Sequence, residues 1–350
     1  MLGRFALLVG SILVTLFFLE LGCRLVRDPA LLLTWENLVL KARLGAADLN
    51  PEKRFSYDSA LGYVQRAGLS SSSVRYNADG FRVGSPLANG AVADPPILTT
   101  GDSYTQGDEV DDEETWPSYL QGLMSWRTVN AGVAAYGLDQ TVLRTEQLVP
   151  KLKPALVVVG FIADNVRRAE MKRTWGTEKP YFDLKDGALV LRNVPVPPSP
   201  KPQDTLSFLQ HAFGWSILVD TVLRHQGWQY EWAVDHERAT PRGTGERLAC
   251  PLMRRLADLG VPMLVVAQYD FYVWENAEFA TEQRRLSSAV LKCARDAGLA
   301  TLDLYDETAR AVRTHGRGAL YRTWHPSPEG YRLIAEGIAA ELRRRHMPPR

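Results

Sequence analysis

The chain has 350 residues, 45% hydrophobic and 23% charged, a composition typical of a globular protein with one large domain or two modest ones. Its formal net charge of +1 gives no basic footprint for nucleic acid, so we expect no nucleic-acid partner. The cysteines Cys23, Cys250 and Cys293 form neither a zinc-ligand spacing nor a CxxC pair, and the last two are expected either as small core residues or as a disulfide.

An uncharged apolar run from Phe5 to Leu19 lies near the start of the chain. As a helix it would rise about 22 Å, which is short of a ~30 Å hydrocarbon core unless its polar ends extend it. We predict that residues 1–27 form an uncleaved membrane anchor. A cleaved or lipid-modified signal segment, giving a secreted or lipid-anchored form, is the first alternative, and a buried helix is the second. Arg4 favours a cytoplasmic amino terminus, although Arg24 and Arg27 oppose it, so the main domain is expected in the periplasm.

Residues 28–95 are expected to form an N-terminal extension of short strands and loops packed on the main domain, which starts at residue 96 and ends near residue 347. Strands in the main domain are predicted at Ile97–Thr100, Arg127–Asn130, Ala155–Ile162, Pro262–Ala267 and Leu299–Leu304. Helices are predicted at Trp116–Ser125, Leu138–Leu152, Glu246–Leu259, Thr281–Ala297 and Pro328–Arg345. Because continuous apolar strands alternate with helices, we predict a three-layer α/β/α fold with a mostly parallel, five-stranded sheet.

An insertion at about residues 167–245 interrupts this alternation. It contains the proline-rich stretch Val194–Pro200, which cannot lie inside a helix or a central strand. It is also rich in aromatic residues. These could belong to a lid or to a segment that lines the substrate site, or they could form the small core of a surface insertion. Both interpretations stay open.

Four segments contain candidate catalytic residues. Three of them follow predicted strands, and the fourth precedes the last predicted helix. Ser103 lies in the turn after the first strand, at the sheet edge where open α/β sheets bind ligands. Nucleophilic catalysis needs a hydroxyl, a base and donors for an oxyanion. We expect Ser103 to supply the hydroxyl and His325 the base. The backbone N–H groups of Ser103 and Gly132, with the side chain of Asn165 or Asp164, are the expected oxyanion hole.

Together these segments resemble the SGNH, or GDSL-type, hydrolases over residues 96–347, and the N-terminal segment is similar to that of membrane-anchored bacterial members. The segments that correspond to the four blocks of the family are Gly101–Thr105, Asn130–Gly132, Gly160–Asn165 and His325–Gly330. The resemblance implies an extracytoplasmic serine esterase that forms an acyl-enzyme on Ser103 and requires no metal or organic cofactor. Its partners would be an acyl-ester small molecule or an acylated glycan, together with the membrane.

Two departures from the family pattern bear on the site. Asp164 precedes Asn165, which reverses the usual order, and an ionised Asp164 would repel an oxyanion. Arg322 and Thr323 stand where the family has an aspartate shortly before the histidine. We therefore predict a Ser–His dyad whose imidazole is held by the backbone carbonyl of Arg322 or Thr323, and not by Asp303, Asp306 or Glu329.

Two alternatives to the esterase are kept open. One is an O-acyltransferase or deacylase of a cell-envelope polysaccharide, which uses the same chemistry with a sugar hydroxyl in place of water. The other is a catalytically weak, membrane-anchored binding protein on the same scaffold, suggested by the two departures. A metal site is not expected, since no metal-ligand spacing connects the remaining histidines, which are His211, His225, His236, His315 and His346.

Overall fold

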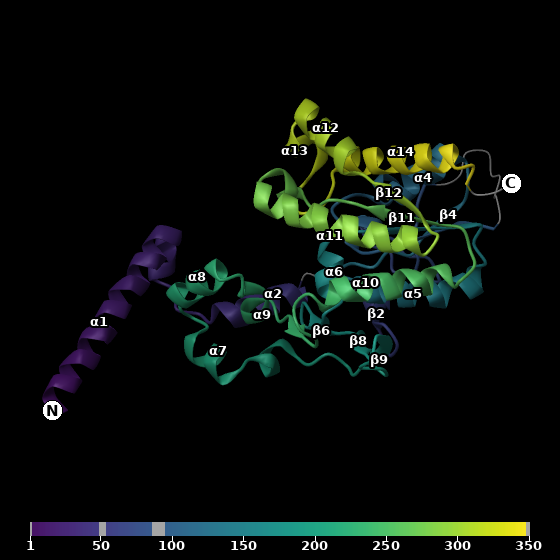
Figure 1. Ribbon diagram of the computed structural model, residues 1–350. Coiled ribbons are helices and arrows are strands. Elements are labelled where there is room, and N and C mark those ends of the chain that lie inside the picture. The colour runs from purple at the N-terminus through teal and green to yellow at the C-terminus, as the bar shows by residue number, and fades with distance from the viewer. Residues whose placement is uncertain (1, 49–53, 86–94, 348–350) are drawn as a thin grey trace. The chain divides into compact units, whose positions relative to one another are not determined.

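The computed structural model describes residues 2–48, 54–85 and 95–347 (Figure 1). Parts of the predicted extension, at 49–53 and 86–94, therefore lie outside the described residues. The chain divides into two compact units. The first comprises residues 1–51, 173–178 and 199–238, and the second comprises 52–172, 179–198 and 239–350. Residues of the predicted insertion thus contribute to both units.

The second unit is built on the five-stranded sheet that the sequence predicts. Its strands are β3 (Ile97–Thr100), β4 (Thr128–Asn130), β5 (Leu156–Phe161), β11 (Met263–Ala267) and β12 (Ala300–Asp303). They lie in the order β12-β11-β5-β3-β4, and every neighbouring pair is parallel. The predicted fold class is therefore confirmed. The parallel order brings the carboxyl ends of all five strands to one edge, where the turns after β3, β4 and β5 meet.

Helices cover both faces of this sheet because its strands are apolar on both sides. Val157, Val159 and Val265 face the core under α5 (Leu138–Leu152), α10 (Thr244–Ala257) and α11 (Ala277–Asp296). The alternate residues Leu156, Val158 and Leu264 pack under α4 (Trp116–Met124) and α14 (Pro328–Arg344). The α10 and α11 helices are also joined by a Cys250–Cys293 disulfide, which decides between the two roles expected for these cysteines.

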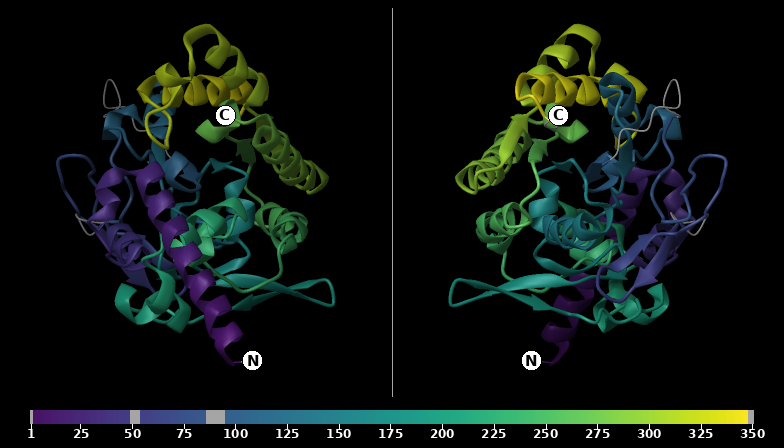
Figure 2. Two further views of the ribbon diagram at one scale, coloured as in Figure 1. Left: turned by 90° about the vertical axis from the view of Figure 1, so that its left-hand side faces the viewer. Right: turned by 90° about the vertical axis from the view of Figure 1, so that its right-hand side faces the viewer.

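Several short elements of the second unit were not predicted. They are η3 (Asp112–Glu114), α3 (Ser103–Gln106), α6 (Asp164–Arg168), α12 (Tyr305–His315), α13 (Arg317–Leu320), η5 (Phe271–Trp274) and the hairpin β8 (Tyr181–Lys185)–β9 (Ala188–Arg192). The hairpin β1 (Phe55–Asp58)–β2 (Gly62–Gln65) falls where the sequence predicts short strands and loops. The β8–β9 hairpin is the long two-stranded ribbon in Figure 2. Among them, α3 carries Ser103, the predicted nucleophile.

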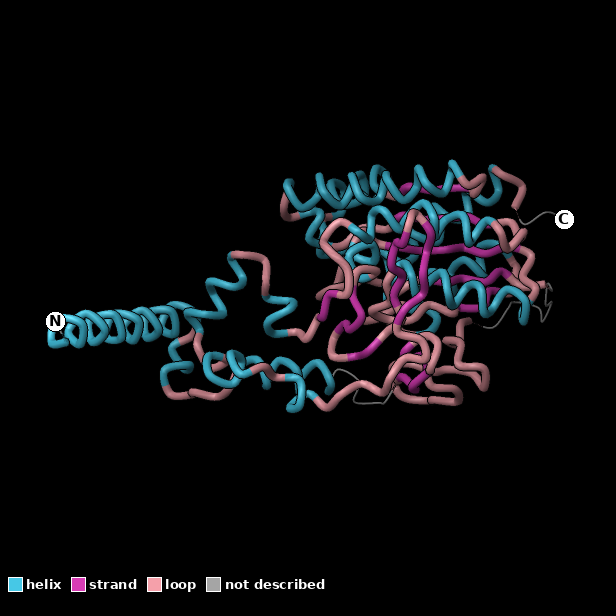
Figure 3. Tube along the Cα trace, turned by 60° about the horizontal axis from the view of Figure 1, so that its bottom comes forward, coloured by secondary structure: helices cyan, strands magenta, loops and turns pink. Residues whose placement is uncertain are grey.

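The first unit is mostly helical and begins with one long helix, α1 (Leu2–Arg27), drawn as an uninterrupted coil in Figure 3. Residues 3–27 are long and apolar enough to cross a membrane, by length and composition, and they are almost wholly exposed. The other elements are η1 (Pro29–Leu32), α2 (Leu38–Asp48), η4 (Pro202–Thr205), α7 (Phe208–Phe213), α8 (Ile217–His225), α9 (Gln229–Ala233), β7 (Thr177–Glu178), β10 (Glu237–Arg238) and part of β6 (Met171–Thr174).

Three glycines let α3 approach the sheet closely. A Cβ at Gly160 would lie 2.6 Å from Oγ1 of Thr105, and one at Gly132 would lie 2.7 Å from Cβ of Thr105. A Cβ at Gly101 would also collide with the Thr105 hydroxyl. Because real side-chain contacts are longer, Thr105 can lie in this position only while all three residues lack a side chain.

We expect Gly160→Ala to lower the free energy of unfolding by about 1–3 kcal/mol, as overpacking in a dense core does. The new methyl group would meet Gln268 at 2.5 Å as well as Thr105, so α3 would have to move. Chemical denaturation of the purified protein measures the effect. Gly122→Ala is the control, because a Cβ at this helical position meets nothing within 4 Å. Equal stability of the two variants would contradict the close packing described here.

Candidate active site

The structure brings together the two residues predicted as nucleophile and base. Ser103 is the first residue of α3, and Asp102 caps this helix by accepting the N–H of Tyr104 at 3.0 Å. His325 lies in a tight turn before α14, in which the Arg322 N–H donates to the His325 carbonyl at 2.9 Å. Nε2 of His325 lies 2.9 Å from Oγ of Ser103, which is a hydrogen-bond distance.

A carboxylate that the sequence analysis missed faces the other side of the imidazole. Oε1 of Glu109 lies 3.4 Å from Nδ1 of His325. This separation is long for a hydrogen bond but suits an ion pair, and catalytic contacts often tighten only when substrate binds. Oε2 of the same carboxylate accepts the backbone N–H groups of Thr323 and Trp324 at 3.0 and 3.2 Å. Glu109 therefore holds the turn that carries the imidazole and faces the Nδ1 atom of the ring.

The predicted backbone partner of the imidazole is thus wrong, because Nδ1 of His325 faces a carboxylate and not a backbone oxygen of Arg322 or Thr323. Arg322 and Thr323 occupy the positions where the family has an aspartate. The carboxylate that faces the imidazole belongs instead to Glu109, in the segment after Ser103. Gly107 ends α3 in the left-handed conformation at φ 91°, which reverses the chain. Glu109 follows at φ 66°, a region that costs a non-glycine residue energy and is kept where its contacts compensate.

The charges on the two groups stabilise each other. Burial alone would raise the pKa of Glu109, but the contact with His325 and the hydrogen bond from Trp324 hold it below its usual value. Burial alone would lower the pKa of His325, whereas Glu109, Asp108 and Asp102 together raise it above its usual value. The imidazolium that forms when a base takes a proton from serine is therefore favoured by its surroundings.

Asn165 occupies a different place from the one predicted. Its side-chain N–H groups donate to Oδ2 of Asp102 at 2.8 Å and to the Tyr136 carbonyl at 3.0 Å, and its Oδ1 accepts the Ile162 N–H at 2.9 Å. Both donors of the amide are thereby used, so Asn165 has none left for an oxyanion. Its amide instead ties the turn after β5 to the residue before the nucleophile.

The other predicted oxyanion groups also have partners. Asp164 pairs with Arg167 at 2.7 Å and with Arg168 at 2.8 Å, so it is an ion-paired acceptor. The Gly132 N–H donates to Oδ1 of Asn130 at 3.1 Å, and serving an oxyanion would require it to share or break that bond. The Ser103 N–H, in the first turn of α3, has no intrahelical acceptor and is the predicted donor that fits best.

An aromatic cluster borders His325. The Trp324 side chain is 53% exposed and packs against Phe271 and Tyr272, with ring centroids 5.7 and 6.0 Å away. Its backbone is fixed on two sides, because the N–H donates to Glu109 and the carbonyl accepts the Tyr104 hydroxyl at 3.1 Å. An exposed indole on a fixed backbone therefore lies next to the predicted base.

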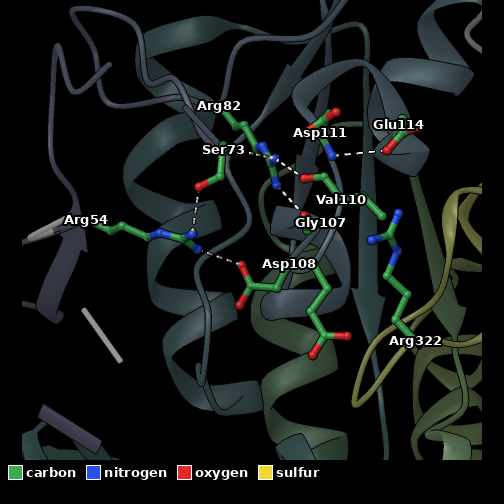
Figure 4. Close-up of a pocket in the computed structure, with 10 residues that line it drawn as sticks. Arg54, Ser73, Arg82, Gly107, Asp108, Val110, Asp111, Glu114 and Arg322 are labelled. Atoms are coloured by element: carbon green, nitrogen blue, oxygen red, sulfur yellow. Dashed lines mark hydrogen bonds and ion pairs between the residues drawn. The ribbon is translucent and has the colours of Figure 1, made fainter. Parts of the chain in front are cut away.

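A polar cavity of about 300 Å³ lies beside Glu109, which is one of the residues that line it (Figure 4). Arg54, Arg82 and Arg322 line it together with acidic residues that include Asp108 and Glu109. Figure 4 shows Arg54 directed toward Asp108, a 3.6 Å ion pair. Within residues 2–48, 54–85 and 95–347, no group of three or more His, Cys, Asp or Glu side chains could hold a metal ion.

The sequence profile of the GDSL-like Lipase/Acylhydrolase family matches residues 99–333. Among solved structures, the chain is similar to LAE5, an alpha/beta hydrolase enzyme from the metagenome of Lake Arreo, Spain, at 14% identity and TM-score 0.45, covering 72% of this chain and 96% of that one. It is also similar to Axe2, an acetylxylan esterase from Geobacillus stearothermophilus, at 16% identity and TM-score 0.43, covering 73% and 95%. A lipolytic protein of the G-D-S-L family from Veillonella parvula DSM 2008 matches at 10% identity and TM-score 0.40, covering 71% and 97%. No curated protein sequence matches.

We expect Glu109→Gln to lower the turnover of a short acyl ester by about 10²- to 10⁴-fold, as losing the partner of a catalytic histidine does. The pH profile gives a second readout. The carboxylate raises the pKa of His325, so its removal lowers that pKa and moves the acidic limb of kcat/KM to lower pH.

Thr323→Ala is the matched control for this variant, because only the backbone N–H of Thr323 contacts Glu109. It should retain nearly full activity and an unchanged pH profile. His325→Ala should be severely impaired. A Glu109→Gln enzyme with the acidic limb of the parent would show that Glu109 does not act through His325.

Proposed function

Because the chain belongs to the GDSL-like lipase/acylhydrolase family, it is an ester-hydrolysing enzyme, and we propose that Ser103 is its nucleophile and His325 its general base. The observation that carries this proposal is the 2.9 Å contact between Ser103 Oγ and His325 Nε2 at the carboxyl edge of the parallel sheet. The two residues lie 222 positions apart in the sequence, and the fold alone brings them together.

In the proposed reaction, Oγ of Ser103 attacks the ester carbonyl carbon while its proton passes to Nε2 of His325. The Ser103 N–H is placed to donate to the oxyanion that forms. When the intermediate collapses, the ester C–O bond breaks and the alcohol leaves with the proton from His325, so an acyl-Ser103 ester remains. Water then attacks this ester with His325 again as base, which releases the carboxylic acid and restores the Ser103 hydroxyl.

Glu109 completes this proposed arrangement as the acid of a Ser–His–Glu triad. Its carboxylate faces Nδ1 of His325, which favours the tautomer that leaves Nε2 free to accept the serine proton. It also stabilises the imidazolium in each proton transfer. Neither the proposed triad nor the ester chemistry draws on a metal ion or an organic cofactor.

We further propose that the enzyme is anchored in a membrane with its catalytic part outside the cytoplasm, in the periplasm. Residues 1–27 are the proposed anchor, 28–95 an extension, and 96–347 the hydrolase domain, which contains the family match at 99–333. The length and apolar composition of α1 support the anchor. The Cys250–Cys293 disulfide supports an oxidising compartment.

A second candidate function is deacylation or O-acylation of a glycan. The exposed indole of Trp324, bordered by Tyr272, favours it, because flat aromatic faces beside a catalytic base suit a sugar ring. An acyltransferase would use the same acyl-Ser103 and differ only in that a sugar hydroxyl, not water, attacks it.

A fluorophosphonate probe should label the folded protein at Ser103, and peptide mass spectrometry would identify the modified residue. Ser103→Ala should abolish both the label and the hydrolysis of short acyl esters. Folding of the variant is checked by circular dichroism. Labelling that persists in Ser103→Ala, or a folded parent that is neither labelled nor active, would contradict the proposed nucleophile.

Trp324→Ala should reduce kcat/KM for an acetylated oligosaccharide by a factor of about 3 to 10, which corresponds to the loss of one aromatic contact. It should leave the hydrolysis of p-nitrophenyl acetate nearly unchanged. Trp228→Ala is the control, since Trp228 has the same 53% exposure but belongs to the first unit. Product analysis with and without a glycan acceptor separates acyl transfer from hydrolysis. Equal loss on both substrates would contradict a glycan platform.

A further inference from the structure

The short helix α7 in the first unit turns its apolar side chains outward. Phe208, Leu209 and Phe213 are 82%, 56% and 48% exposed, whereas Gln210 is buried. With about 100° between successive residues, the three exposed apolar residues lie on one side of the helix and Gln210 on the other. A surface helix of a soluble domain shows the opposite arrangement, with its apolar side inward.

Polar contacts fix this orientation. The Gln210 side chain donates to the Trp232 carbonyl at 2.8 Å and accepts the Ser207 N–H at 2.8 Å, which caps the helix. The Asn37 side chain donates to the Gln210 carbonyl at 2.9 Å, and the Leu38 N–H donates to the Gly214 carbonyl at 2.8 Å. Because these bonds hold the polar side of α7 against the rest of the unit, the apolar side stays largely exposed.

The same unit holds the end of α1 rigidly beside the start of α8. The buried Glu20 carboxylate accepts the Ser216 hydroxyl at 2.7 Å and the Ile217 N–H at 2.9 Å. Arg24, also buried, donates to Glu20 at 2.7 Å and to the Trp215 carbonyl at 2.6 Å. The α8 helix packs against α1 (Figure 1), and only three residues separate it from α7. The carboxyl end of α1 and the apolar side of α7 are therefore held at fixed positions within the first unit, through their contacts with the start of α8.

Further apolar side chains are exposed just after α1. Leu33 is 88% exposed, and Trp35 is 45% exposed with its ring 5.5 Å from that of Trp215. Tryptophan is enriched at the level of lipid headgroups, where its ring is partly apolar and its N–H stays hydrated. Exposed apolar clusters of this kind mark an interaction surface, and this one lies where the proposed anchor leaves the bilayer.

We propose that α7 is a second membrane contact, with Phe208, Leu209 and Phe213 inserted into the interfacial layer of a phospholipid bilayer. This inference rests on the proposed membrane anchor and goes beyond the proposed ester chemistry. A bilayer fits this face better than a protein partner does, because α1 in the same unit also presents an apolar surface with almost no protein cover. Two fixed points of contact would hold the first unit at a set orientation on the membrane, as interfacial helices do.

The test places spin labels in the full-length protein, reconstituted in vesicles of phosphatidylcholine and phosphatidylglycerol. Single labels replace Phe208, Phe213 or His211 in a Cys23→Ser background, since Cys23 is the free cysteine in the described chain. His211 is the matched control, exposed on the same helix but outside its apolar side. Accessibility to oxygen, which concentrates in lipid, is compared with accessibility to a water-soluble nickel complex.

Oxygen should dominate at positions 208 and 213, and the nickel complex should dominate at 211. Labels at 208 and 213 that are as water-accessible as 211 would overturn the proposal, and protection from both reagents would indicate a protein partner and overturn it too. A label at Leu13 reads the anchor separately. If the label at Leu13 is exposed to lipid and the labels on α7 are exposed to water, only the proposed α7 contact is wrong. If the label at Leu13 is exposed to water, the proposed membrane anchor is wrong as well. Ester hydrolysis, measured in parallel, reports on the catalytic proposal independently.

Discussion

The site depends on how closely the short helix α3 approaches the sheet. Thr105, on the inner side of α3, lies against the Cα positions of Gly101, Gly132 and Gly160. Gly101 and Gly132 follow the ends of β3 and β4, and Gly160 lies near the end of β5. This contact sets the height of Ser103 above the strand ends, and hence its distance from His325. The motif glycines therefore act first through packing, because any side chain at these positions would displace the helix that carries the nucleophile.

The proposed nucleophile and the proposed acid come from one short segment, α3 and the turn after it, and the imidazole lies between their side chains. Gly107 reverses the chain after α3, and Glu109 then reaches back to His325 and to the backbone of the turn before α14. The histidine is thus positioned by a segment whose place is already set by the packing of α3. The weak-binding-protein interpretation was based on a missing acid and on the reversed order of Asp164 and Asn165, and Glu109 answers the first of these two arguments.

Much of the fold follows from the sequence, because runs such as Val157–Val159 are apolar and β-branched at every position, as is typical of strands buried on both faces. Ser103 and His325 were also predictable, since turn chemistry and helix caps mark their places. Glu109 was not predictable, because an acidic residue in a loop has the same sequence signature whether it faces water or an imidazole. The available signal was a glycine that ends a helix, followed closely by a carboxylate.

Asn165 has a different place from the predicted one for a similar reason. An amide can stabilise an oxyanion or bridge buried groups, and only its partners in the structure distinguish the two.

The central claim is that Glu109 orients His325 so that its bare Nε2 faces the Ser103 hydroxyl. The most direct test is nitrogen NMR of the His325 imidazole in the full-length protein, at a pH where the ring is neutral, because the two ring nitrogens report which one carries the proton. The account predicts the proton on Nδ1, toward Glu109, and an unprotonated Nε2. A proton on Nε2 with Nδ1 bare would contradict it, because Nε2 could not then accept the serine proton.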